Sequence, residues 1–320
     1  MACLSPLELS LQELNNIVKN TKNHFLYSDK LSEQVMMVLN QDALSHSDKL
    51  EPDINHEKTL RQLEEAWEYA VAHFSGNINR DFVIDVAQKV HATNYSYRQE
   101  TARVKGIRGT IDVVTNPAKI EREMDKLFDY LLTSTSHPAL KAAELNLYFL
   151  LIHPFADGNG RTARLLHNLY LHNYKLPPVM IRHTERVTYL SHIEDARIGF
   201  KNRSGQENMF ENRSFGEIRF FEYTIDKIKE SAERLSKKIE NHHKYEISVD
   251  IRGPQKLIFG VTRTFKELLH ARALSGQVSQ KEGKITIIAP ITEECVMGTM
   301  ERYARKSPST IKNYDVQKLF

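Results

Sequence analysis

The chain has 320 residues and a mass of 37.0 kDa, a length that corresponds to about two domains. Apolar residues make up 41% and charged residues 27% of it, which excludes a disordered or collagen-like protein. Two cysteines exclude a disulfide framework and a four-cysteine zinc site, and a net charge of +3 does not by itself indicate a nucleic-acid-binding protein.

The sequence shows no membrane-targeting feature. No apolar run approaches the roughly 18 residues of a membrane span, and residues 1–16 are acidic where a secretory signal peptide is basic. We therefore expect a cytoplasmic protein without a membrane partner. An effector delivered into a host cell without a cleaved signal would have the same features.

Apolar spacing predicts helices along most of the chain. Residues 1–56 form an N-terminal helical segment that ends in a loop over 45–55, which contains Pro52. Apolar residues three and four positions apart then predict helices over the following ranges: 60–74, 82–90, 120–131, 161–173, 185–197 and 217–239. The stretch 139–153 is apolar nearly all round, which is typical of the buried centre of a bundle.

Two regions depart from this helical pattern. Residues 106–117 combine glycines, β-branched residues and a terminal Asn-Pro, which predicts a short hairpin. Beyond residue 247 we expect strands at 256–261 and 284–289 around a helix at 264–273, in a tail (252–320) with 12 Lys/Arg against 6 Asp/Glu. The predicted fold is mainly α, with an N-terminal segment (1–56), a helical domain with one hairpin (57–246) and a small basic α/β module (247–320).

Residues 153–164 read HPFADGNGRTAR and combine several features of a phosphate site. Pro154 must stop the preceding helix, which leaves His153 at its C-terminal end. Gly158 and Gly160 permit a backbone that points successive N–H groups into one concavity. The next helix begins at once, so that its free N–H groups and positive dipole end point to the same place.

Charged side chains complete this site. Arg161 and Arg164 lie three residues apart on the first turn of the second helix, where two guanidinium groups can hold phosphate oxygens. Asp157 is a hard oxygen ligand suited to Mg²⁺ shared with a polyphosphate. The absence of a lysine after the glycines excludes a Walker A motif. A base, a metal ligand, a phosphate nest and two arginines favour attack at a phosphorus atom.

This stretch resembles the signature of the Fic family, H-x-F-x-[DE]-G-N-G-R-x-x-R, at every specified position. The resemblance covers about residues 60–240, including the hairpin, Leu165-Leu166, Pro177-Pro178 and Ile181-Arg182. It implies a Fic-type helical bundle that transfers AMP from ATP to a Ser, Thr or Tyr hydroxyl of a target protein and of the enzyme itself, with Mg²⁺ as the cofactor.

The resemblance assigns roles to individual residues. His153 is the general base, Phe155 anchors the loop, and Asp157 holds Mg²⁺. The nucleotide and its phosphates are bound by Asp157, Gly158, Asn159, Gly160, Arg161, Thr162, Ala163 and Arg164, and Tyr189 and Leu190 lie near the adenine. Arg197 stands where relatives often carry Asn. The flap residues Val113, Val114, Thr115 and Asn116 pair with an extended segment of the target protein by strand addition.

Many members of this family are held inactive by a helix with the pattern [ST]-x-x-x-E-[GN], whose glutamate pairs with the second arginine of the motif. Nothing before residue 153 matches this pattern, whereas Ser236, Glu240 and Asn241 match it. We therefore predict Glu240 as the inhibitory glutamate. An ordinary polar helix end is the alternative reading of this pattern, and the enzyme would then be restrained by an antitoxin-like partner or not at all. A homo-oligomer is a further possible partner.

The motif leaves other functions open. The same fold uses other donors, such as UTP, GTP or the phosphocholine group of CDP-choline, or removes AMP instead. A DNA-binding regulator with a vestigial Fic core is an alternative from another class, suggested by the basic tail. The intact His153, Asp157 and both arginines argue against it, and we do not expect nucleic acid as a partner.

Overall fold

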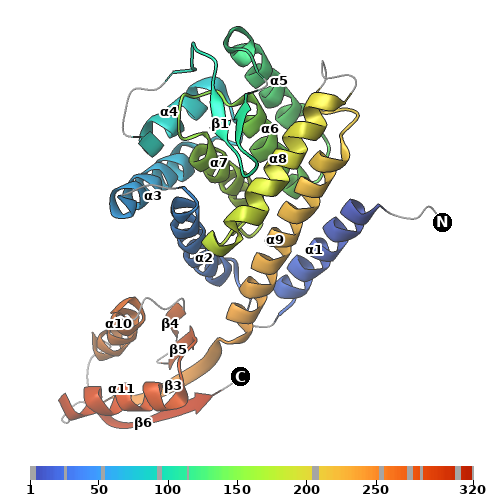
Figure 1. The fold of residues 1–320 in the computed structure, drawn as a ribbon. Helices are drawn as coiled ribbons and strands as arrows, with labels where there is room; N and C mark the ends of the chain where they lie inside the picture. The colour runs from blue at the N-terminus through green and yellow to red at the C-terminus, as the bar shows by residue number, and fades with distance from the viewer. Residues whose placement is uncertain are drawn as a thin grey trace. The chain divides into compact units, whose positions relative to one another are not determined.

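The computed structural model describes residues 5–24, 27–51, 55–91, 96–113, 115–203, 209–251, 256–271, 277–281, 284–306 and 311–318 (Figure 1). Contacts between Cα atoms divide the chain into two compact units. The first comprises residues 1–17 and 39–232, and the second comprises residues 18–38 and 233–320. The domain boundaries expected near residues 56 and 246 stay predictions.

The first unit is helical, as predicted. Its elements are α1 (Pro6–Lys22), α2 (Asp29–Lys49), α3 (His56–His73), α4 (Arg80–His91), α5 (Ile120–Thr133), α6 (Pro138–Ile152), α7 (Asn159–Asn173), α8 (Arg186–Asn202) and α9 (Phe215–Glu240), with short 3₁₀ turns at Pro117–Lys119 and His183–Glu185. Parts of α1, α2 and α9 belong to the second unit. The mainly α fold class is confirmed.

Helix α6 is the centre of the first unit. Pro138 occupies its first turn, where a missing N–H costs nothing, and the His137 side chain accepts a hydrogen bond from the Ala139 N–H. Every residue from Ala139 to Ile152 is buried, with α5 and α7 packed against the helix. The central buried helix expected from its apolar sequence is therefore confirmed.

Helix α2 is longer than its sequence suggested. The loop expected over residues 45–55 is wrong in its first half, because α2 continues to Lys49. Leu44, Ser47 and Leu50 are buried, so the inner face of the helix extends up to its end. Beyond the helix, the Glu51 N–H donates to the Asp48 carbonyl. The end of α2 is therefore a packed element of the first unit.

A hairpin is present, but it begins earlier than the predicted range 106–117, because residues 106–109 form its turn: its strands are β1 (Arg103–Lys105) and β2 (Thr110–Asp112), which pair antiparallel. Gly109 has a φ of +128°, a conformation that a side chain would strain. The turn is bound to α8, because the Glu194 carboxylate accepts hydrogen bonds from the N–H groups of Ile107 (3.1 Å) and Arg108 (3.4 Å). The hairpin is thus held at its tip.

The second unit contains β3 (His243–Ile251), α10 (Lys256–Ala271), β4 (Gln277–Lys281), β5 (Lys284–Ala289), α11 (Glu293–Lys306) and β6 (Ile311–Lys318). The sheet order is β4-β5-β3-β6, and neighbouring strands are antiparallel. This is the ferredoxin-like arrangement of two split βαβ units. The strand expected at 256–261 is wrong, because Val261, Phe265 and Leu269, four residues apart, form the buried face of α10. The strand at 284–289 is confirmed as β5.

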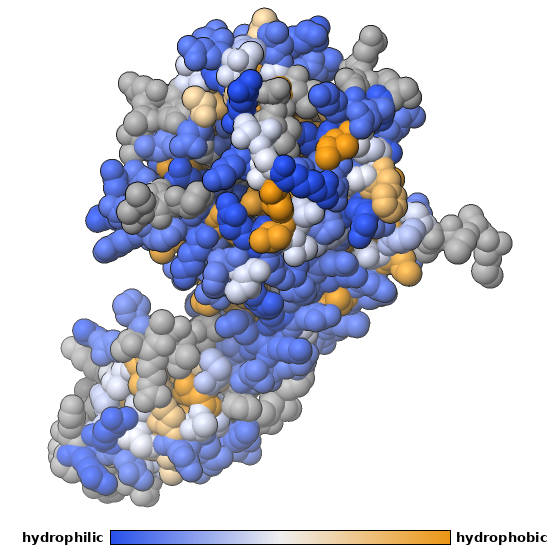
Figure 2. All heavy atoms as spheres, viewed as in Figure 1, coloured by the Kyte–Doolittle hydropathy of each residue, from blue (hydrophilic) through white to orange (hydrophobic). Residues whose placement is uncertain are grey.

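The face shown in Figure 2 is largely hydrophilic, with a few small apolar groups. The large apolar side chains that are exposed come from different helices and include Met37, Leu132, Val187 and Phe215. Within the described ranges, no helix is both long enough and apolar enough to cross a membrane.

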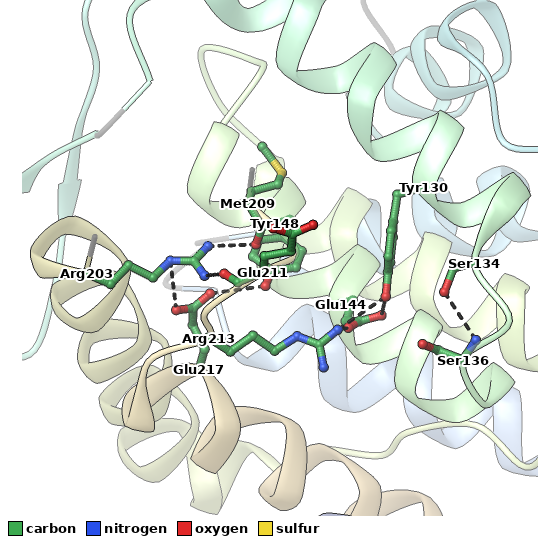
Figure 3. A network of polar contacts seen from close by, with 10 residues as sticks. All are labelled: Tyr130, Ser134, Ser136, Glu144, Tyr148, Arg203, Met209, Glu211, Arg213 and Glu217. Atoms are coloured by element: carbon green, nitrogen blue, oxygen red, sulfur yellow. Dashed lines mark hydrogen bonds and ion pairs between the residues drawn. The ribbon is translucent and has the colours of Figure 1, made fainter. Parts of the chain in front are cut away.

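A buried polar network joins the helices around α6 (Figure 3). Glu144 of α6 is fully buried and accepts a hydrogen bond from the Tyr130 hydroxyl of α5 at 2.8 Å. Arg213, which precedes α9, donates to the other carboxylate oxygen of Glu144. Burial raises the pKa of Glu144, and the Arg213 charge opposes this.

A second buried carboxylate, Glu217, continues the network at the start of α9. Ser214 and Glu217 form a capping box, in which each side chain accepts from the backbone N–H of the other. Glu217 also accepts from the Tyr148 hydroxyl of α6 at 3.1 Å and pairs with Arg203 at 3.4 Å. The first turn of α9 is thereby fixed against α6.

We expect Glu144→Ala to lower the free energy of unfolding by about 3 kcal/mol, because it leaves Arg213 and Tyr130 without their buried acceptor. The matched control is Arg61→Ala, which removes an exposed pair with Glu65 and should cost about 0.5 kcal/mol or less. Urea unfolding followed by circular dichroism measures both. Equal losses in the two variants would contradict a stabilising role of the network.

Candidate active site

The C-terminal end of α6 places His153 at the site. Its N–H donates to the Phe149 carbonyl at 2.8 Å, and its φ of 53° is left-handed, which is uncommon for a residue with a side chain. Pro154 follows and cannot continue the helix. The backbone therefore turns sharply at His153.

The loop after His153 is closed by Asn159. Its side-chain amide donates to the Phe155 carbonyl at 2.8 Å and its side-chain oxygen accepts from the Phe155 N–H at 3.0 Å. Phe155 is fully buried between the rings of Tyr97 and Phe149. The expected anchor role of Phe155 agrees with this packing. The side chain of Asn159 closes the loop, and the predicted binding of phosphates by Gly158, Asn159 and Gly160 stays a prediction.

Helix α7 begins at Asn159, and the first N–H groups of a helix have no partner within it. Gly158 has a φ of 73°, and its N–H donates to the Asp157 carboxylate at 2.6 Å. The Asp157 side chain itself is exposed. Thr162 and Ala163, expected among the ligand-binding residues, have fully buried side chains, and the Thr162 N–H donates to the Gly158 carbonyl.

The metal that the motif implies is Mg²⁺, and the donor set fits this ion. One exposed carboxylate beside a phosphate nest is typical of Mg²⁺ bound chiefly by substrate phosphates, because Mg²⁺ keeps waters and uses one or two carboxylates. Within the described ranges, no cluster of three or more His, Cys, Asp or Glu side chains forms a separate metal cage. Asp157 is therefore the residue that would hold the metal together with a nucleotide.

Arg164, the second arginine of the motif, is paired with the end of α2. Its Nη2 donates to the Glu51 carboxylate at 2.8 Å, and its Nε donates to the Ser47 hydroxyl at 2.8 Å. Burial works to lower the pKa of Arg164, but the charge of Glu51 raises it overall. The Arg186 side chain, which donates to the Leu50 carbonyl at 2.6 Å, holds the same helix end.

The Glu51 carboxylate also lies over the phosphate nest. A Cβ built on Gly160 would lie 2.6 Å from the Glu51 Oε1 and 3.1 Å from the Arg164 Nη1. Next to Arg164 there remains a cavity of about 10 Å³, lined by Ser47, His167 and other residues, which is about the size of one water molecule. The position that favours an anion is thus filled by a carboxylate of the chain itself.

The prediction of Glu240 as the partner of Arg164 is therefore corrected. The Glu51 carboxylate is the one that binds this arginine, whereas Glu240 lies exposed at the end of α9 and accepts a hydrogen bond from Ser236 at 2.8 Å. Asn241 is exposed as well, and its N–H donates to the Lys237 carbonyl. The Ser236–Asn241 pattern has the geometry of an ordinary polar helix end.

The surroundings of His153 keep its imidazole neutral. Burial, followed by the charges of Arg197 and Arg98, lowers the pKa of His153 to about 4, and a hydrogen bond to the Leu150 carbonyl and the charge of Asp157 oppose this only in part. At neutral pH the ring is therefore able to accept a proton, as a general base requires.

The residues expected near the adenine lie on α8. Tyr189 is buried, with the Arg164 guanidinium 6.0 Å from the centre of its ring, and its hydroxyl donates to the Asn146 side chain at 3.3 Å. Leu190 is half-buried. Arg197 follows on the same helix and is 5% exposed.

The flap residues lie at the C-terminal end of the hairpin. The Val113 N–H donates to the Ala102 carbonyl at 3.0 Å, and Val113 and Thr115 are half-buried. Val114 lies outside the described residues. The Asn116 side chain accepts from the Ala118 N–H at 3.0 Å and so caps the turn before α5. The predicted pairing of this segment with a target protein stays a prediction.

The comparison with protein families decides how this site is classified. Residues 77–171, which contain the hairpin, α6, the loop and α7, match the Fic/DOC family. The chain contains a Fic domain. The expected family is confirmed, and curated relatives agree. A protein adenylyltransferase Fic of Nematostella vectensis is 32% identical over 154 residues, which are 46% of this chain and 35% of the relative.

A second curated relative is the protein adenylyltransferase fic-1 of Caenorhabditis elegans, 36% identical over 87 residues, which are 26% of this chain and 17% of the relative. The chain thus spans about a third or less of the length of these two relatives.

Solved Fic structures share the fold. A Fic-domain-containing signalling protein of Bacteroides thetaiotaomicron has a TM-score of 0.58 at 17% identity and covers 74% of this chain and 98% of its own. The Fic-1 protein of C. elegans (residues 134–508) has a TM-score of 0.55 at 17% identity, with 73% of each chain covered. At such identities these likenesses concern the Fic fold alone.

The structure brings further residues to the Fic site. Ser47 and Glu51 have the S-x-x-x-E spacing of the inhibitory pattern, but Pro52 stands in place of the final Gly or Asn. A search that left this last position open would have found them. Arg98 binds the His153 carbonyl before the loop, and Glu194 binds the Ile107 N–H at the tip of the hairpin. No local sequence pattern marks either residue.

Acid should destabilise the fold through His167. Burial lowers the pKa of His167 to about 3, against about 6.5 in an unfolded chain, so that the unfolded chain binds more protons between these values. The free energy of unfolding should therefore fall as the pH drops from about 6.5 toward 3. In His167→Gln this fall should be smaller, because glutamine takes no proton, and urea unfolding at about pH 7 and pH 4.5 measures it. A parallel fall in parent and variant would contradict this assignment.

Proposed function

We propose that the chain is a protein adenylyltransferase, which transfers AMP from ATP to a hydroxyl group of a target protein. The observation that carries the proposal is a neutral, half-buried His153 at the end of α6, followed directly by the nest and by Arg161 and Arg164 on α7. The names of the curated relatives support the same reaction.

In the proposed reaction His153 accepts the proton of a Ser, Thr or Tyr hydroxyl as its oxygen attacks the α-phosphorus of ATP. The new oxygen–phosphorus bond forms as the bond to pyrophosphate breaks, so that AMP is transferred and pyrophosphate leaves. The free N–H groups of α7 and the two arginines are placed to stabilise the negative charge of the phosphates. Bound at Asp157, Mg²⁺ would neutralise phosphate charge.

The hairpin supports a protein as the acceptor. It is a two-stranded sheet with an outer edge on each strand, and its tip is bound to α8 through Glu194. An extended segment of a target protein adds to such an edge through main-chain hydrogen bonds. We propose that the segment at Val113, Val114, Thr115 and Asn116 aligns the target hydroxyl with His153.

The structure supports a restrained state of this enzyme. Glu51 holds Arg164 and lies over Gly160, where an anionic ligand would bind. The outer phosphates of ATP would compete with this carboxylate for the same arginine. We therefore propose Glu51, presented by the end of α2, as the inhibitory glutamate. Such a restraint within the chain requires no antitoxin-like partner or second copy.

We expect His153→Ala to lower AMP transfer by about 10²- to 10⁴-fold, because the variant lacks the general base. Fold and ATP binding should remain close to those of the parent. Label transfer from α-³²P-ATP to a mixture of proteins and to the chain itself measures the activity, and calorimetry measures the binding of ATP. Undiminished transfer would contradict the proposed mechanism.

We expect Glu51→Gly to raise auto-modification at least about tenfold, because it frees Arg164 for the phosphates and permits in-line attack. The matched control is Glu240→Gly, which removes an exposed carboxylate and should leave activity at the parental level. In Glu51→Gly with Arg164→Ala the gain should be lost, since the freed arginine is itself needed. Activation by Glu240→Gly instead would contradict the assignment of Glu51.

A further inference from the structure

Arg98 is a buried cation. Within the described residues, its side-chain hydrogen bonds go to backbone carbonyls. It is 6% exposed. Its Nε donates to the His153 carbonyl at 2.7 Å, and its Nη1 donates to the Glu100 carbonyl at 2.6 Å. Its Nη2 donates to the carbonyls of Thr115 at 2.7 Å and Ile152 at 3.4 Å. The planar guanidinium thus binds four carbonyls in three separate segments of the chain.

Two of these carbonyls belong to the end of α6. The last carbonyls of a helix have no partner within it, and a buried helix end needs donors from elsewhere. Arg98 supplies them at Ile152 and His153, and its own backbone N–H donates to the Pro154 carbonyl at 2.9 Å. Nε and Nη2 of the planar guanidinium bind the carbonyls of His153 and Ile152 in a fixed geometry. This restricts the rotation of the His153 peptide and with it the direction of the imidazole.

A third carbonyl belongs to the flap. Thr115 lies two residues after Val113, which is bonded to Ala102 before β1. A shift of this end of the hairpin therefore moves an acceptor of the same guanidinium that holds His153. Nη2 of Arg98 binds the Thr115 carbonyl, and Nε of the same planar group binds the His153 carbonyl. The flap and His153 are therefore held as parts of one rigid unit.

We propose that Arg98 is a positioning residue that orients His153 and couples its orientation to the position of the flap. The inference rests on the proposed function, since it takes His153 as the base. A target segment that binds the flap would then fix the base at the same time as the attacking hydroxyl.

The charge of Arg98 acts on the pKa of His153, which can be measured and therefore reports on this geometry. The charged groups that act on His153 are Arg197 of α8, Arg98 and Asp157, in addition to its burial and the Leu150 carbonyl. Removal of the Arg98 charge should raise the pKa of His153, whereas a lysine at the same position keeps a positive charge but cannot reach four carbonyls.

The experiment compares Arg98→Gln and Arg98→Lys in the full-length Glu51→Gly chain. Both should lower kcat for AMP transfer by about 100-fold, because a misplaced base is as costly as an absent one, while KM for ATP changes less than about threefold. The acid limb of the kcat profile should move to higher pH in Arg98→Gln and stay near that of the parent in Arg98→Lys. The matched control is Arg80→Gln, an exposed arginine over the Tyr97 ring, with unchanged kcat.

A second measurement is independent of activity. Titration of the His153 ring by NMR in the full chain should give a pKa of about 4 in the parent, a higher value in Arg98→Gln and nearly the parental value in Arg98→Lys. If these shifts occur but no variant transfers AMP, the proposed function fails while the coupling of Arg98 to His153 stands. A kcat of both variants within threefold of Arg80→Gln, in a chain whose activity depends on His153, would overturn the proposal. If Arg98→Gln does not fold, kcat of Arg98→Lys decides.

Discussion

The site depends on how a fully buried helix ends. Helix α6 has no exposed residue from Ala139 to Ile152, so its last carbonyls reach no water and must be satisfied by other groups. Arg98 supplies donors to Ile152 and His153, and the Asn159 side chain closes the loop that follows. The same contacts that stabilise the helix end therefore also fix His153 and the loop that follows it.

The sequence was sufficient for the features that local patterns determine. Apolar spacing predicted the central helix, and Gly109 and the β-branched residues predicted the hairpin, because each depends on neighbours within a few residues. The loop of residues 153–164 combines a proline, two glycines and two arginines at fixed spacing, so the end of one helix and the immediate start of the next could be predicted as well.

The sequence did not predict features that depend on contacts between residues far apart in the chain. The pair of Glu51 with Arg164 joins residues 113 positions apart, and Pro52 hid the pattern that would have indicated it. The loop expected at residues 45–55 failed for the same reason, since the burial of Ser47 and Leu50 favours helix over a polar, proline-containing sequence. In α10 the apolar residues before Val261 are compatible with a strand as well as with a helix. The helix is favoured because its buried face packs against the sheet.

The low proton affinity of His153 has a consequence for control. Because burial and the charges of Arg197 and Arg98 lower the pKa of His153 to about 4, its ring is uncharged at neutral pH. A change of acidity near neutral pH therefore leaves the charge of this residue unaltered and does not switch the proposed enzyme on or off. In the proposed enzyme, control would instead need a mechanical event, the withdrawal of the Glu51 carboxylate from Arg164, and hence something that moves the end of α2.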